Sequence, residues 1–174
     1  TGNGERRMKL ADCIDRLSIG TGKAVSWIVP VLVLELVYDT AARYLFNAPT
    51  FWSYDISYML YGTLFMLGAA WTLQQEEHVR IDIVSGKLSP RARAAVDVLG
   101  YLVFFFPAVG ALVAYGASFS LESWMILERS GQSMWQPPIY IFKTVLPLAG
   151  LLLFLQGLAR FCRSLRVLRK GEKA

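Results

Sequence analysis

Four long apolar stretches divide the chain, over residues 24–44, 56–73, 96–119 and 139–158. A transmembrane helix needs about 20 mostly apolar residues to cross the hydrocarbon core of a bilayer. Each stretch is close to that length, and the charged residues gather in the segments between them. The pattern therefore predicts an all-α integral membrane protein with four transmembrane helices.

Prolines interrupt three of these stretches, at Pro30, Pro107 and Pro147. In a water-soluble helix an internal proline removes a hydrogen bond and its ring clashes with the preceding turn. In a membrane bundle, neighbouring groups satisfy the freed backbone, so such prolines are tolerated as kinks. We therefore keep all four stretches as helices.

The segment before the first span carries its own helical pattern. Leu10, Ile14 and Leu17 recur at helical spacing among charged residues. This spacing predicts an interfacial amphipathic helix that leads into the first span. Residues 1–7 precede Met8 and are interpreted as a tag remnant, so that residues 8–174 form a single four-helix membrane domain.

The third helix is expected to be unusually long. Ser89-Pro90 is typical of an N-cap followed by proline at the first helical position. A helix from Pro90 toward Glu128 would contain about 39 residues and extend about 58 Å. Because the apolar core is only about 30 Å thick, the helix must tilt, protrude or break near Gly116.

Basic residues set the orientation. Of the 18 lysines and arginines, all but Arg43, Arg129 and Lys143 lie in the N-terminal flank, the connection between spans two and three, or the C-terminal tail. Cytoplasmic segments carry the excess of positive charge in membrane proteins. Both ends of the chain are therefore predicted to be cytoplasmic.

Composition agrees with this class. The chain is 55% hydrophobic and 18% charged, with a net charge of +5, whereas soluble domains carry about 25% charged residues. Membrane topology explains the basicity better than nucleic-acid binding does. Cys13 and Cys162 lie far apart, each in a basic flank, and are interpreted as reduced thiols.

The sharpest candidate for chemistry is an acidic stripe in the first span. Glu35, Asp39 and Arg43 follow at intervals of four, which places them on one helical face. An ionisable group near the membrane centre is costly and suggests function, here a proton or cation coupling site. The alternative is a polar seam in which Asp39 pairs with Arg43 and Glu35 is protonated or bonded to a neighbouring helix. We favour the seam because the arginine is built into the stripe.

The sequence shows no pattern of catalytic, metal-binding or cofactor-binding residues. The single histidine, His78, lies just beyond the cytoplasmic end of the second span, and haem in a membrane cytochrome usually needs two histidines within the spans. Two cysteines with one histidine cannot form a four-ligand zinc site. There is no Ser-His-Asp pattern or glycine-rich phosphate loop. We predict a protein that is not an enzyme and holds no cofactor or metal.

Two sets of residues indicate contacts with other helices or subunits. Gly110, Ala114 and Ser118 form a ladder of small residues that permits close helix approach, either within this bundle or with another subunit. Lys143 joins the acidic stripe and this ladder as a candidate for the polar seam and subunit interface.

Aromatic residues cluster at the outer ends of the spans, where membrane proteins carry an aromatic belt. The loop of residues 120–138 also mixes apolar and charged side chains, which suggests a docking surface for an external partner. The candidate docking residues are Trp52, Asp55, Trp124, Glu128, Arg129 and Trp135.

Three blocks of sequence resemble a known family. They are DTAARYLFNAPTFW at residues 39–52; EHVRID at 77–82, with Ser89-Pro90 and Asp97; and residues 133–156, with Trp135, Pro137, Pro138, Lys143, Pro147, Leu152 and Gln156. In order and spacing the chain resembles the small membrane subunit of tripartite ATP-independent periplasmic (TRAP) transporters, the DctQ family. Asp55 departs slightly, since many members have glutamate there.

The resemblance implies a partner protein. Such subunits associate with a large permease subunit that carries the substrate and sodium sites, while a periplasmic binding protein delivers the substrate, usually a carboxylate. The small subunit would brace the static scaffold in a bacterial inner membrane. The stripe from Glu35 to Arg43 would then seat the first helix, and the outer loops would face the binding protein.

Two alternatives compete with this interpretation. One is a self-sufficient small proton-coupled transporter in which Glu35 is the coupling acid. The other is a membrane anchor for a redox enzyme, against which the lack of paired intramembrane histidines counts.

Overall fold

The computed structural model of the chain describes residues 2–75 and 90–170. Its elements in these ranges are all helices: α1 Gly2–Ser26, α2 Ile28–Leu45, α3 Ser53–Gln74, α5 Pro90–Gly100, the π-helix η1 Tyr101–Phe105, α6 Phe106–Met125, α7 Ile139–Lys143 and α8 Val145–Lys170. Four helical stretches are long and apolar enough to cross a membrane: Cys13–Phe46, Ser53–Gln74, Ala94–Met125 and Ile139–Leu168. The predicted all-α membrane fold with four spans is confirmed.

Each irregularity in the helices lies four residues before a proline. The pairs are Ser26 with Pro30, Val103 with Pro107, and Lys143 with Pro147. A proline ring clashes with the carbonyl group four residues earlier and offers no N–H to bond it. α1 and α7 therefore end at the first and last of these carbonyls, while the middle one lies inside the π-helix.

A break near Gly116, one of the three ways in which we expected the long third helix to fit the membrane, is not there. Gly116 lies within α6, where a Cβ atom added to it would be 3.3 Å from the Leu146 side chain. The irregularity occurs instead at η1, where the N–H of Phe106 donates to the carbonyl of Tyr101. The wider turn accommodates Pro107, so the proline rather than the glycine decides where this helix changes.

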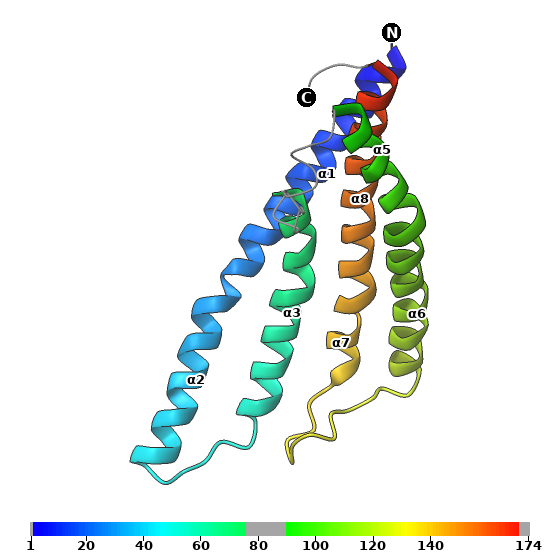
Figure 1. Cartoon of the computed structure of the whole chain (residues 1–174). Helices are drawn as coiled ribbons and strands as arrows, with labels where there is room; N and C mark the ends of the chain where they lie inside the picture. Colours follow the sequence, from blue (N-terminus) through cyan, green and yellow to red (C-terminus); the bar gives the residue numbers. More distant parts are fainter. Residues whose placement is uncertain (1, 76–89, 171–174) are drawn as a thin grey trace.

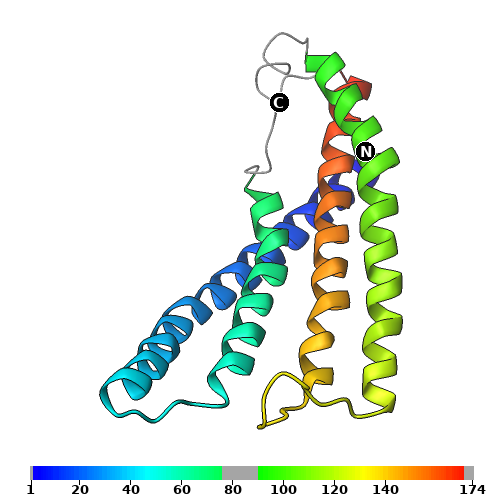
Figure 2. The same ribbon diagram turned by 60° about the horizontal axis from the view of Figure 1, so that its bottom comes forward.

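The four spans form an open row. α3 packs between α2 and α8, and α8 packs between α3 and α6. Figures 1 and 2 show these helices side by side in two views, with α1 leading into α2 and crossing α3 and α8. Because a single row of helices encloses little interior, many large apolar side chains of the spans remain exposed.

The start of α1 and the end of α8 lie at one end of the row, where α5 also begins (Figure 1). The α2–α3 and α6–α7 connections lie at the opposite end. We call this the outer end, because the excess of basic residues lies in the N-terminal flank, the C-terminal tail and the connection between spans two and three, which are therefore predicted to be cytoplasmic. The amphipathic N-terminal segment is helical, as predicted. It continues into α2 past Trp27, and it buries Ser18, Gly22 and Val25 in its packing against α3 and α8.

A glycine on α8 permits the close approach of the π-helix. A Cβ atom built at Gly157 would lie 2.0 Å from the Phe105 ring. We expect Gly157→Ala to destabilise the chain by about 1–3 kcal/mol, because the ring must move within a packed interface. Gly110→Ala is the matched control, since nothing lies within 4 Å of its Cβ position. Equal melting temperatures for the two variants in detergent would contradict this packing.

Candidate functional site

Glu35 joins α2 to α3. The hydroxyl groups of Ser53 and Ser57 each donate a hydrogen bond to the Glu35 carboxyl group, the second at 2.5 Å from Oε2. Ser53 and Ser57 are one helical turn apart, so they meet both carboxyl oxygens at once. Glu35 is buried at 9% exposure. Its side chain is thus a tie between two neighbouring helices.

Asp39 makes a second tie closer to the outer end. Arg43 Nη2 lies 3.1 Å from Asp39 Oδ2, the ion pair that the spacing of the stripe predicted. The Thr50 hydroxyl donates to Asp39 Oδ1 from the connection that precedes α3. The Arg43 side chain is half exposed. The stripe therefore fixes α2 and the α2–α3 connection together.

Asp55 lies beneath the outer loop, residues 126–138, rather than on the surface of the protein. It is 1% exposed, and it accepts hydrogen bonds from the hydroxyls of Ser130, at 2.6 Å, and Ser133. Ser130 Oγ in turn accepts a hydrogen bond from the backbone N–H of Gln132, and Ser133 Oγ accepts one from the N–H of Trp135, each at 3.2 Å. In this structure Asp55 cannot touch a docked partner, which corrects its expected place on the surface. It holds the loop from below.

The outer loop, residues 126–138, folds back on itself. The N–H of Ile139 donates to the Glu128 carbonyl at 3.0 Å, and the N–H of Ser130 donates to the Pro137 carbonyl at 2.9 Å. Arg129 Nη1 donates to the Gln136 carbonyl at 3.2 Å. These bonds give the loop a defined shape.

Lys143 supports the same loop from α7. Its Nζ lies 2.5 Å from Glu128 Oε2 and 3.9 Å above the centre of the Phe119 ring. Lys143 therefore has no part in the α2–α3 tie of Glu35. The residues that we grouped as one polar seam form separate sets, because Glu35 is bonded to serines of α3 whereas Lys143 is bonded to Glu128 of the outer loop.

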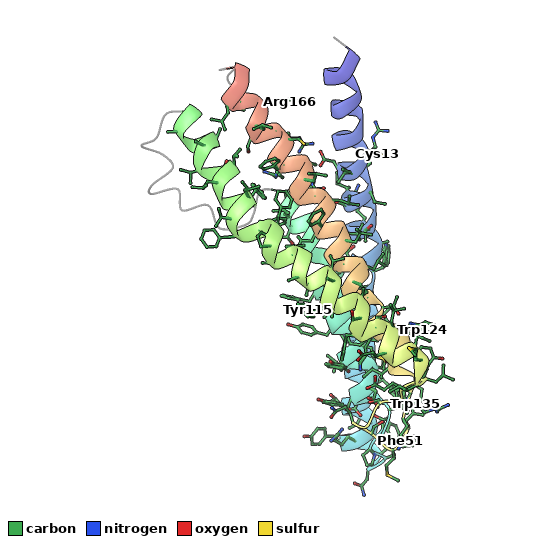
Figure 3. All side chains as sticks on the ribbon, turned by 90° about the vertical axis from the view of Figure 1, so that its right-hand side faces the viewer. Cys13, Phe51, Tyr115, Trp124, Trp135 and Arg166 are labelled. Carbon is green, nitrogen blue, oxygen red and sulfur yellow. The ribbon has the colours of Figure 1, made fainter. Side chains whose placement is uncertain are left out.

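Two of the tryptophans near the outer end contact the ring of a tyrosine, and one of the two also donates a hydrogen bond to a threonine hydroxyl. Trp124 Nε1 donates to Thr144 Oγ1 at 2.8 Å, and its ring centre lies 4.5 Å from that of Tyr140. Trp52 stacks on Tyr38 with 5.9 Å between ring centres. Trp135 is 45% exposed. Figure 3 shows Phe51, Trp124 and Trp135 at the same end of the molecule, opposite Cys13 and Arg166.

The ladder of small residues on α6 does not pack within the bundle. Gly110 has open space at its Cβ position, and the Ser118 hydroxyl bonds the Ala114 carbonyl of its own helix. Ala114 and Ser118 are exposed. The buried residues of α6 are instead Val109, Gly116, Ser120 and Ser123. This arrangement does not support packing within the bundle, and contact with another subunit stays a prediction.

The inner half contains a buried polar cluster to which we assigned no role. Gln156 is fully buried, accepts the Ser18 hydroxyl at 2.9 Å and donates to Asp15 Oδ1 at 2.9 Å. Arg163 donates to the other Asp15 oxygen. This cluster ties α1 to α8. A glutamine within an apolar span was the signal that could have revealed it.

Nothing in the described ranges suggests a metal centre. No group of three histidine, cysteine, aspartate or glutamate side chains is placed there to hold an ion. Cys13 and Cys162 are free thiols. His78 and the EHVRID block lie outside the described residues, as does Ser89.

The pairing with Lys143 makes the outer loop sensitive to acid. The ammonium group of Lys143 donates to Glu128 and holds the pKa of that carboxyl group below its ordinary value of 4.5. Such a group stabilises the fold above its ordinary pKa, and the stabilisation is lost as the pH falls through the lowered value. We expect Glu128→Gln to lower the melting temperature at neutral pH, and the gap to wild type to close progressively as the pH falls below the ordinary pKa of 4.5. A gap that persists in acid would show that the ion pair is not its source.

The chain is similar to known proteins. The sequence model described as "Tripartite ATP-independent periplasmic transporters, DctQ component" matches residues 32–167. The chain is 27% identical over 89 residues to the sialic acid TRAP transporter small permease protein SiaQ of Vibrio cholerae, a match that covers 51% of each protein. The chain thus spans about half the length of the curated relative that it matches. The resemblance drawn from the three sequence blocks is confirmed.

Proposed function

Because the chain belongs to the DctQ component family of tripartite ATP-independent periplasmic transporters, we propose that it braces a large permease subunit in the membrane. The observation that carries this proposal is the open row of spans, whose apolar faces remain exposed in the isolated chain. An open row suits a brace, because it can lay one side against a larger protein and leave the other to lipid.

The acids support a bracing role over proton coupling. Both oxygens of Glu35 are bonded to serines of α3, and Asp39 is bonded to Arg43 and Thr50. Each acid thus holds α2 in place. A coupling acid would need to exchange protons with water during transport, which requires these bonds to break in every cycle.

The partners follow from the family. The large permease subunit would carry the substrate and sodium sites, and a periplasmic binding protein would deliver a carboxylate for sodium-driven uptake across a bacterial inner membrane. The name of the Vibrio cholerae relative specifies sialic acid, which is a carboxylate. This chain would hold no cofactor of its own.

The outer loop is the surface proposed for the binding protein. It presents exposed apolar and charged side chains: Ile126, Leu127, Met134 and Trp135, with Arg129. Asp55 and Lys143 fix the loop from beneath, so its shape is defined before a partner arrives. Preformed surfaces bind with a smaller loss of conformational entropy.

Copurification tests the bracing role. The tagged chain is expressed with the large permease of the same transporter, extracted in mild detergent and analysed by size exclusion. We expect one stable complex of the two subunits. A tagged chain that elutes alone while the permease remains intact would contradict the proposal.

A further inference from the structure

The outward face of α6 carries a groove. Its volume is about 680 Å³, and its lining includes Ala111, Tyr115, Ser118 and Glu122 of α6 together with Leu146 of α8. The positions on α6 follow at intervals of three and four, so they share one helical face. The groove runs along the span toward the outer end.

Tyr115 places a hydroxyl group deep in the membrane. It lies ten residues before the end of α6 at Met125, or about 15 Å along the helix axis. That distance is about half the thickness of the hydrocarbon core. Tyr115 is 77% exposed, and no described residue hydrogen-bonds its hydroxyl. A hydroxyl left among lipid chains without a partner is unfavourable.

Glu122 lies on the same face, two turns nearer the outer end. Its side chain is exposed and lines the groove, and no described basic residue pairs with it. A carboxylate at this level complements a lysine or arginine at the outer end of a second helix. The face thus offers one hydrogen-bonding group in mid-membrane and one negative charge at its outer end.

A second outward groove, on α2, differs in chemistry. Its volume is about 510 Å³, and its lining includes Val33, Val37 and Thr40. The Thr40 hydroxyl is already bonded to the Leu36 carbonyl at 2.8 Å. Tyr44, which also lines this groove, lies one residue from the end of α2, where its hydroxyl can reach the headgroups. Lipid chains can therefore fill this groove without leaving a polar group unpaired.

We propose that the α6 groove seats a transmembrane helix of the large permease subunit. That helix supplies a hydrogen-bonding side chain to Tyr115 and a basic side chain to Glu122. The small residues Gly110, Ala114 and Ser118 border this face and let the two backbones approach closely. The inference rests on the proposed function and adds the side of the chain that meets the permease.

Site-specific photocrosslinking tests this assignment in the intact complex. A benzophenone amino acid replaces Leu112 in the α6 groove or, as the matched control, Val37 in the α2 groove. Both are exposed apolar residues in grooves on outward helix faces. We expect several-fold more crosslinked permease from position 112 than from position 37. Equal crosslinking, or more from position 37, overturns the proposal.

Two further variants test the polar contacts. Tyr115→Phe is expected to speed dissociation of the purified complex about threefold, the effect of one hydrogen bond between membrane helices. Glu122→Ala, which removes both the charge and the acceptor, is expected to speed dissociation by at least the same factor. Tyr44→Phe is the control, because its hydroxyl lies at the headgroup level. Unchanged dissociation of both variants overturns the assigned contacts. A wild-type chain that forms no complex refutes the proposed function itself, whereas a stable complex without crosslinking at position 112 refutes only this inference.

Discussion

Replacing Glu35 with glutamine is expected to preserve the complex and its transport, whereas replacing it with alanine is expected to loosen α2. The amide of glutamine can accept one serine hydroxyl and donate to the other, so both contacts with α3 survive. Alanine removes both contacts and leaves Ser53 and Ser57 without their partner. The expected loss of stability is about 1–3 kcal/mol, since each of the two hydrogen bonds contributes about 0.5–1.5 kcal/mol net.

Thermal unfolding in detergent measures the loss, and Leu34→Ala is its control. Leu34 is next to Glu35 and 69% exposed, so its truncation removes little internal packing. Sodium-driven uptake by the reconstituted complex then separates the two roles of the acid. If Glu35→Gln assembles normally yet abolishes uptake, Glu35 is a coupling residue and the structural tie is not its main role.

Replacing Asp55 with alanine is expected to release the outer loop. The change leaves the hydroxyls of Ser130 and Ser133 without their acceptor, and both hydroxyls also hold backbone groups of the loop. Loss of hydrogen bonds to a charged group costs about 1.5–3 kcal/mol each. Because 1.4 kcal/mol is a tenfold change in an equilibrium, the open loop should be at least about tenfold more populated.

Trypsin cleavage after Arg129 reports on this opening. We expect slow cleavage in the wild type, fast cleavage in Asp55→Ala and an intermediate rate in Ser133→Ala, which removes one of the two contacts. Uptake that depends on the binding protein should be highest in the wild type, lower in Ser133→Ala and lowest in Asp55→Ala. If Asp55→Ala keeps both the protection and the uptake of the wild type, Asp55 does not hold the loop.

Hydropathy was sufficient to predict the spans, because the requirement for about 20 apolar residues is strict in a bilayer. The local breaks were less predictable. A break near Gly116 was one of three expectations for the third helix, yet a glycine within a membrane helix keeps its hydrogen bonds. Pro107 lacks an N–H, and its ring would clash with the carbonyl group of Val103. That carbonyl group lies within the π-helix. The positions of the prolines alone would have located all three irregularities.

The contacts of the acids could be predicted only where they are local. The Asp39–Arg43 pair follows from helical spacing. The contacts of Asp55 with Ser130 and Ser133 join segments 75 and 78 residues apart, and only the fold brings them together. For the same reason, Glu35 and Lys143 were grouped as one seam although they lie on different helix pairs. Which helices are neighbours is not encoded in the apolar pattern.

We propose that this chain braces a permease and does not transport alone. Proteoliposomes that contain the chain alone, the large permease alone, or both subunits test this most directly, under an inward sodium gradient. The substrate is the labelled carboxylate that stabilises the binding protein of the same system in a thermal-shift assay, supplied on that protein. We expect uptake only when both subunits are present. Uptake by the chain alone, at a rate matching that of the two subunits together, would contradict the account.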